Sequence, residues 1–251
     1  MNDLFFLERK ETTEELPLSD NTVSNRRLIG LFLLTAGIFS LYLLVGIGKI
    51  HLFNSESLLT KLLVPNVLIF LFLLSYWLCT TYSPFKLFKI PRWADLKIGL
   101  LIFLSQVVYS LTMSSVLAAL NLTTENRAAL EYAKLPHTPK VFSILALDNF
   151  SNLMIEEIIS IFFFLTINAI LFRYLKRSTA IGLAWILSGV LFSLLHFDAY
   201  NWHLAQMFLI IGVERLFMTG VYIRTRNLWI SFMLHYIFDM IIFLSVMLVQ
   251  H

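Results

Sequence analysis

NLMIEEIISIFFFL (residues 152–165) places two adjacent carboxylates, Glu156 and Glu157, inside an otherwise apolar run. A carboxylate at the depth of a bilayer core costs about 3 kcal/mol on insertion scales, so intramembrane acids usually face a partner or water. The whole chain shows the same contrast, because 58% of its 251 residues are hydrophobic and only 14% are charged. A soluble domain carries about 25% charged residues. The sequence therefore predicts an all-α, polytopic transmembrane helical bundle that holds two acids in its interior.

Seven apolar segments are long enough to cross the hydrocarbon, which takes about 20 residues of helix. They cover roughly 28–48, 62–82, 97–120, 141–172, 180–197, 202–223 and 228–249. The fourth is longer than a straight crossing needs, so we expect it to be tilted or to begin as an interfacial helix. Three regions follow: an N-terminal tail (1–27), three membrane helices (28–120) and a core of four membrane helices (141–249).

The basic residues of the connections predict the orientation. The connections on the side of the N-terminal tail carry 13 Lys and Arg, and those on the other side carry 5. By the positive-inside rule, we expect a cytoplasmic N-terminus and an outside C-terminus. The net charge of +3 is spread between apolar spans without a basic patch, which argues against nucleic acid as a partner and leaves the lipid bilayer. A single cysteine, Cys79, excludes a disulfide within one chain.

Three of the spans carry polar side chains at helical spacing, where residues three or four apart share a face. These are Asn149, Asn152, Glu156 and Ser160 in the fourth span, Ser188, Phe192 and His196 in the fifth, and Ser231, His235 and Asp239 in the seventh. Polar faces in a membrane should turn toward one another. We therefore predict one shared site built from Glu156, Glu157, His196, His235 and Asp239.

This set of side chains suits the hydrolysis of a peptide bond. A desolvated glutamate beside a second acid can act as a general base for water. A histidine or another polar side chain on a facing helix can stabilise the oxyanion of a tetrahedral intermediate. Two histidines and a carboxylate are also zinc ligands, but the ligands are dispersed and no HExxH pair occurs. We expect no cofactor, with zinc as the competing arrangement.

Three motifs in this order resemble the CPBP family, the Abi or type II CAAX prenyl endopeptidase-like intramembrane proteases. They are the EE pair, FSLLH (192–196, an FxxxH pattern) and FMTGVYIRTRNLWISFMLHYIFD (217–239). The resemblance covers roughly residues 141–245.

The resemblance implies a role for each predicted site residue. Glu156 would activate water with Glu157 as its supporting acid, His196 would assist, and His235 and Asp239 would line the oxyanion site. It favours a metal-free mechanism and a membrane-associated peptide or protein as substrate. It also implies a bacterial cell membrane and a role in peptide maturation, signalling or bacteriocin-type immunity.

The first motif departs from the family pattern EExxxR, because Ile161 occupies the arginine position. An arginine there would hold one carboxylate as an anion, and without it we expect Glu157 to be protonated. Arg215 lies inside the sixth span, and we predict that it reaches toward the glutamate pair in place of the missing cation.

Two other functions are compatible with these residues. A catalytically weakened relative could be a scaffold or immunity protein that binds a peptide or a sensor protein, which the missing arginine favours. A proton-coupled carrier would also use intramembrane Glu and His, although the inverted repeats of many carriers are not visible.

Overall fold

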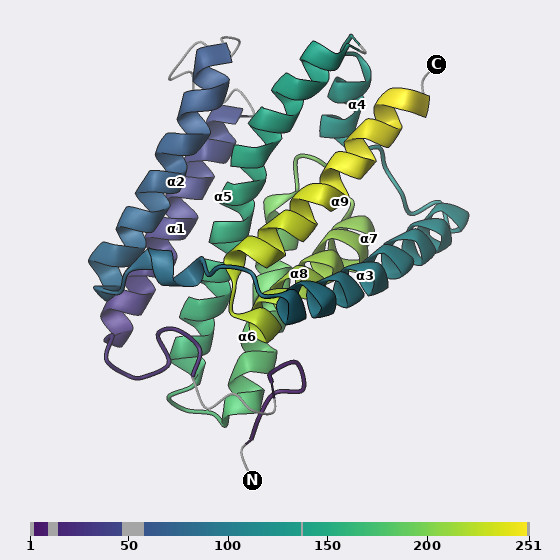
Figure 1. Cartoon of the computed structure of the whole chain (residues 1–251). Helices are drawn as coiled ribbons and strands as arrows, with labels where there is room; N and C mark the ends of the chain where they lie inside the picture. The colour runs from purple at the N-terminus through teal and green to yellow at the C-terminus, as the bar shows by residue number, and fades with distance from the viewer. Residues whose placement is uncertain (1–2, 10–14, 47–57, 137, 250–251) are drawn as a thin grey trace.

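The computed structural model describes residues 3–9, 15–46, 58–136 and 138–249. Within these ranges every regular element is helical (Figure 1), and seven helical stretches are long and apolar enough to cross a membrane. Five are single helices: α1 (Asn25–Gly46), α2 (Leu58–Thr80), α3 (Trp93–Ala119), α5 (Pro139–Leu171) and α6 (Arg177–Leu195). The sixth joins α7 (Leu204–Gln206), the π-helical η2 (Met207–Gly212) and α8 (Val213–Thr225), and the seventh is α9 (Leu228–Val249). The prediction of an all-α bundle with seven spans is confirmed.

The helix α5 forms the axis of the bundle. It is one unbroken helix of 33 residues, about 50 Å at 1.5 Å per residue, so the start of the predicted fourth span continues into the rest without a break. Thr138 caps its first turn by accepting a hydrogen bond from the Val141 amide, and Pro139 occupies the start, where no amide proton is needed. In its membrane window 83% of the residues are buried, against 44% or less in the other six, because α1, α2, α6 and α9 surround it (Figure 1).

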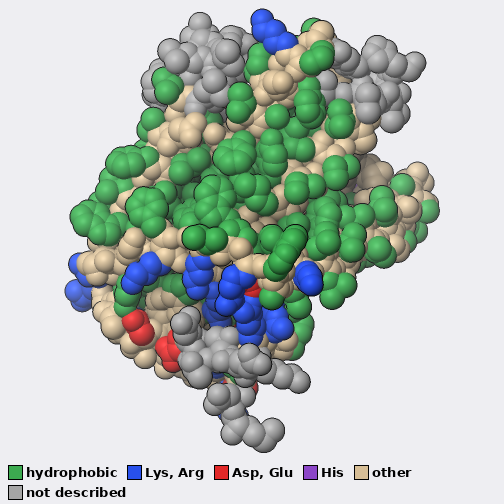
Figure 2. Space-filling model, viewed as in Figure 1, with side chains coloured by type: hydrophobic (Ala, Val, Ile, Leu, Met, Phe, Trp, Pro, Cys, Tyr) green, Lys and Arg blue, Asp and Glu red, His purple; other side chains and the backbone are tan. Residues whose placement is uncertain are grey.

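The surface of the bundle is apolar over the height that a bilayer would cover. Large hydrophobic side chains are exposed along the outer helices, among them Leu33, Phe70, Trp77, Leu104 and Leu111. Figure 2 shows this apolar belt, with Lys and Arg gathered below it, at the end of the molecule that carries the N-terminal segment. An exposed belt of this kind is suited to lipid.

The described part of the predicted N-terminal tail packs against the ends of the helices. The Glu8 carboxylate is fully buried and accepts hydrogen bonds from Arg177 at 3.0 and 2.8 Å and a further one from Arg226. Arg224 donates to the Glu8 carbonyl oxygen at 2.7 Å. Burial raises the pKa of Glu8, but the bond from Arg177 and the charge of Arg226 hold that pKa below its usual value. The buried side chains of Phe5, Leu16, Leu18 and Val23 complete the contact.

Two glycines allow α6 to approach the η2–α8 helix closely. A Cβ atom at Gly189 would lie 2.7 Å from a methyl group of Leu216, and one at Gly212 would collide with the Ser193 hydroxyl. The sixth span runs from Leu204 to Thr225, against the predicted range 202–223, and contains a π-helical turn just before Arg215. This close crossing brings Arg215 toward the axis of the bundle.

Candidate active site

The predicted site residues come from three helices that face one another. Glu156 and Glu157 lie in the middle of α5, and His235 and Asp239 lie one turn apart on α9. The prediction placed His196 inside the fifth span. In the structure His196 is instead the C-terminal cap of α6, one residue after Leu195. The structure brings all five together, and their roles stay predictions.

Glu157 is fully buried and held as one half of an ion pair. The two terminal nitrogens of Arg215 each donate to one of its oxygens at 2.8 Å, and the Ser231 hydroxyl donates to Oε1. The Arg215 side chain is only 1% exposed, and its guanidinium lies 5.3 Å from the centre of the Phe192 ring. A two-pronged bond of this kind requires a carboxylate and is among the strongest that side chains form.

The predicted contact between Arg215 and the glutamate pair is thus confirmed. The expectation that Glu157 is protonated is wrong, because the cation missing at position 161 arrives from α8. Ile161 is itself fully buried in the apolar core of α5.

His235 lies between the two glutamates. Its Nδ1 is 3.4 Å from Glu157 Oε2, and its Nε2 is 4.0 Å from Glu156 Oε2 and 3.7 Å from Asp239 Oδ2. Glu157 therefore faces one nitrogen of the ring and leaves the other directed at Glu156. A carboxylate on the far side of a histidine is the usual device for fixing which way the ring points.

His196 directs its Nε2 toward Glu156. Its Nδ1 lies 3.0 Å from the Phe192 carbonyl oxygen, and a carbonyl can only accept, so Nδ1 carries the proton. The other nitrogen, Nε2, lies 3.9 Å from Glu156 Oε2. The Phe192 ring packs on the imidazole with 4.6 Å between ring centres. The FxxxH motif thus supplies both the histidine and the groups that orient it.

Glu156 is the accessible member of the glutamate pair. Its side chain is 26% exposed, whereas that of Glu157 is 0% exposed. The gaps of 3.9 and 4.0 Å to the two histidine nitrogens suit one water oxygen at about 2.8 Å from each group. Glu156, His196 and His235 can therefore share one water molecule.

The rest of the polar stripe on α5 is satisfied by partners that sequence reasoning missed. Asn152 accepts a hydrogen bond from the Tyr42 hydroxyl at 2.7 Å, and Asn149 accepts one from Tyr132 at 2.9 Å. The chain has nine tyrosines, and no sequence motif distinguishes Tyr42 and Tyr132 from the others. Ser231 lay on the predicted polar face of the seventh span, but nothing in the sequence indicated Glu157 as its partner.

Within the described ranges, no three His, Cys, Asp or Glu side chains are grouped as metal ligands. The expectation that the protein uses no cofactor, with zinc as the competing arrangement, stays a prediction.

A segment that covers α5 to most of α9 matches a known family. Residues 138–241 match the family model described as type II CAAX prenyl endopeptidase Rce1-like, so the predicted resemblance is confirmed over that segment. It contains all five predicted site residues and Arg215. This is a protease family, so over residues 138–241 the chain is similar to CAAX proteases, and the seven apolar helices together with this match support an integral membrane protein. No curated protein and no solved structure gave a match.

Proposed function

We propose that this protein is an intramembrane endopeptidase in which Glu156 activates water to hydrolyse a peptide bond of a membrane-associated peptide or protein. One observation carries the proposal. Glu156, the accessible acid, faces the Nε2 atoms of His196 and His235 at 3.9 and 4.0 Å, while the neighbouring acid is locked away from them in an ion pair.

In the first step a water molecule bridges Glu156 and His196. Glu156 takes one proton of this water as general base, and the Nε2 lone pair of His196 accepts a hydrogen bond from the other. The water oxygen then forms a bond to the carbonyl carbon of the substrate, whose oxygen becomes an oxyanion. The proton on Glu156 passes to the leaving amine when the C–N bond breaks, which returns the carboxylate.

His235 stabilises the oxyanion as an imidazolium that donates through Nε2. Carboxylates lie near both of its nitrogens, Glu157 at Nδ1 and Asp239 at Nε2, and they favour its positive charge. Asp239 therefore acts by orienting His235 and does not itself need to donate a hydrogen bond. Glu157 is a positioning residue, because its oxygens are occupied by Arg215 and Ser231.

No step of this mechanism requires a metal ion. Elemental analysis of the purified protein tests this point: about one zinc per chain, with activity lost on chelation and restored by zinc, would contradict it.

Glu156→Gln tests the proposed function, because an amide keeps the shape of the side chain but cannot take a proton from water. We expect a loss of at least about 100-fold in hydrolysis, with normal accumulation in the membrane. Membrane peptides from cells with the wild-type chain and with the variant would be compared by mass spectrometry, with Glu131→Gln, an exposed acid on α4 (Arg127–Ala133), as the matched control.

An unchanged set of peptides in Glu156→Gln cells would rule out the protease. A scaffold would keep its partner bound and its phenotype in this variant. A carrier would lose proton-coupled uptake without any change in peptide cleavage.

We also propose that the chain lies in a bacterial cell membrane, acts in peptide maturation, signalling or self-immunity, and has its N-terminal segment in the cytoplasm. The N-terminal segment and the end of α9 lie at opposite ends of the bundle, and the basic side chains gather at the first of these ends (Figures 1 and 2). In a Cys79→Ser background, a membrane-impermeant thiol reagent should label Glu131→Cys but not Ser178→Cys in intact cells. The reverse pattern would refute this orientation.

A further inference from the structure

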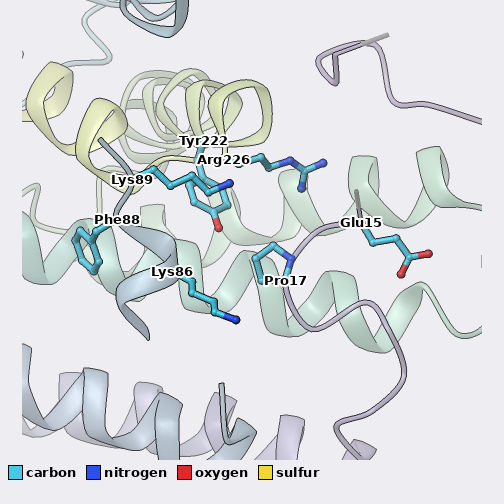
Figure 3. Close-up of a pocket in the computed structure, with 7 residues that line it drawn as sticks. All are labelled: Glu15, Pro17, Lys86, Phe88, Lys89, Tyr222 and Arg226. Carbon is cyan, nitrogen blue, oxygen red and sulfur yellow. The ribbon is translucent and has the colours of Figure 1, made fainter. Parts of the chain in front are cut away.

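A pocket of about 360 Å³ opens at the basic end of the molecule, away from the glutamate–histidine cluster. It lies between the connection from α2 to α3, the C-terminal end of α8 and the N-terminal segment (Figure 3). Its lining residues are Glu15, Pro17, Lys86, Phe88, Lys89, Tyr222 and Arg226. None of them has a part in the proposed hydrolysis.

The lining carries three cations and one acid. Lys86 and Lys89 are exposed, and neither makes an ion pair with a described residue. In Figure 3 the Glu15 carboxylate points away from both lysines. Arg226 shares Glu8 with Arg177, and its Nη1 is buried without a hydrogen-bond partner. The pocket therefore has an excess of positive charge that the described residues leave uncompensated.

Tyr222 adds a hydroxyl to the lining of this pocket. The side chain is 1% exposed, and its hydroxyl makes no hydrogen bond with the described residues. In Figure 3 this hydroxyl lies between the lysine side chains, against Pro17. A tyrosine hydroxyl that lines a pocket and has no partner among the described residues is free to donate a hydrogen bond to a ligand.

The backbone that carries the lysines is fixed in place. The Asn227 side chain accepts a hydrogen bond from the Lys89 amide at 3.2 Å and donates one to the Lys89 carbonyl oxygen at 2.8 Å. Asn227 is itself buried between α8 and α9. The connection between α2 and α3 is thus attached to the same helix end that supplies Tyr222 and Arg226, and the pocket is preformed.

The same connection exposes large apolar side chains beside the lysines. Phe85, Ile90 and Trp93 are 72, 92 and 77% exposed. In a membrane protein such side chains enter the lipid, and tryptophan favours the level of the headgroups. Exposed apolar side chains and basic side chains therefore stand together on the connection that lines the pocket.

We propose that this pocket binds the phosphate of an anionic phospholipid headgroup. Lys86, Lys89 and Tyr222 donate hydrogen bonds to the phosphate oxygens, Arg226 adds positive charge at the back, and the acyl chains run along Phe85, Ile90 and Trp93. Basic pockets at the membrane boundary are a known means of holding such lipids. A free phosphate ion has the same charged oxygens but cannot use the apolar side chains.

The test uses the purified full chain in a neutral detergent. Its thermal unfolding midpoint is followed while short-chain phosphatidylglycerol, short-chain phosphatidylcholine or inorganic phosphate is added at constant ionic strength. The pocket variant is Lys86→Gln/Lys89→Gln. The matched control, Lys97→Gln/Lys176→Gln, removes the same charge from two exposed lysines that do not line the pocket.

Phosphatidylglycerol should raise the unfolding midpoint of the wild-type and control proteins, with a dissociation constant at least tenfold higher in the pocket variant. Tyr222→Phe should weaken binding several-fold. Equal binding by the pocket variant and the control would overturn the proposal, since general charge would then suffice. Equal stabilisation by inorganic phosphate or by phosphatidylcholine would also overturn it, since neither an anionic lipid nor its acyl chains would then be needed.

Discussion

Arg215 supplies the charge that the first motif lacks at Ile161, and the active site depends on this one side chain. Removing one partner of a buried ion pair costs about 3–5 kcal/mol, because the other charge stays buried. We expect Arg215→Gln to lower the free energy of unfolding by about that amount and to abolish cleavage. His235 would lose its orientation, since Glu157 lies 3.4 Å from its Nδ1.

The double variant Arg215→Gln/Ile161→Arg should regain part of both properties, because position 161 is one helical turn from Glu157. Unfolding in denaturant and peptide cleavage would be measured on each protein, with Arg127→Gln, which breaks an exposed ion pair, as control. Normal cleavage by Arg215→Gln alone would show that hydrogen bonds and water suffice to hold the acids.

His196 should separate catalysis from stability. Its imidazole is about one-fifth exposed, lies at the C-terminal cap of α6 and is hydrogen-bonded to the Phe192 carbonyl oxygen, so His196→Ala should cost less stability than the loss of a fully buried side chain. We expect a loss of cleavage of about 100-fold or more with a nearly unchanged unfolding midpoint. His203→Ala, which alters a histidine to which we assign no role, should leave cleavage intact. Full activity of His196→Ala would remove this residue from the mechanism.

Sequence reasoning grouped the five candidate residues that the structure brings together, because charged groups inside apolar spans are few. It also found the Arg215 contact, since a buried acid needs a cation and Arg215 lies inside a span. It could not find Tyr42, Tyr132 or the part played by Ser231. Their hydrogen bonds depend on which helices become neighbours, and a hydroxyl in an apolar span has many candidate partners.

At the scale of elements, the crossing of α6 and the η2–α8 helix decides where Arg215 points. Gly212→Ala would push a methyl group into the Ser193 hydroxyl. Inserting volume at a tight contact typically costs about 1–3 kcal/mol. We expect a lower unfolding midpoint and slower cleavage, because the helix that carries Arg215 must shift. Gly37→Ala on α1, where a Cβ would meet nothing within 4 Å, is the matched control. Equal unfolding midpoints of the two variants would show that the contact between α6 and the η2–α8 helix can accommodate an added methyl group.

The seven spans were predictable because their length and hydropathy alone define them. The length of the fourth span was visible too, but its continuity as a single helix was not. Hydrophobicity cannot distinguish one long helix from two shorter ones. In the structure the neighbouring helices bury α5 along most of its length, and this packing depends on the tertiary structure. The π-helical turn before Arg215 has no mark in the sequence.

For the whole molecule, the N-terminal segment joins the helix ends through Glu8. Glu8→Gln would leave Arg177 and Arg226 without their common anion, and we expect a loss of about 3 kcal/mol of unfolding free energy at neutral pH. Thermal unfolding of the full chain would measure it, with Asp3→Asn, whose carboxylate accepts a hydrogen bond from Ser178 at the surface, as control.

The effect of Glu8 should depend on pH in one direction. Arg177 and Arg226 hold the pKa of the folded Glu8 below its ordinary value of 4.5 against the opposing effect of burial. The stabilisation that the Glu8 carboxylate provides is thus fully present above the ordinary pKa of 4.5. It is lost as the pH falls through the lower pKa of Glu8 in the folded protein. The difference between wild type and Glu8→Gln should be constant near neutral pH and shrink below about pH 4.5. A difference that grows as the medium becomes more acidic would refute the assignment.

The ion pair inside the bundle has a consequence for how the chain enters the membrane. Glu157 and Arg215 are 58 residues apart, so α5 emerges from the ribosome well before its counter-charge has been made. In the EExxxR pattern the arginine lies on the same helix and would enter with the acid. We therefore expect α5 to be stably inserted only after α8 has been made. A chain cut short before α8 should therefore leave α5 poorly inserted and open to membrane proteases, which a ladder of C-terminal truncations fused to a glycosylation or alkylation reporter would reveal.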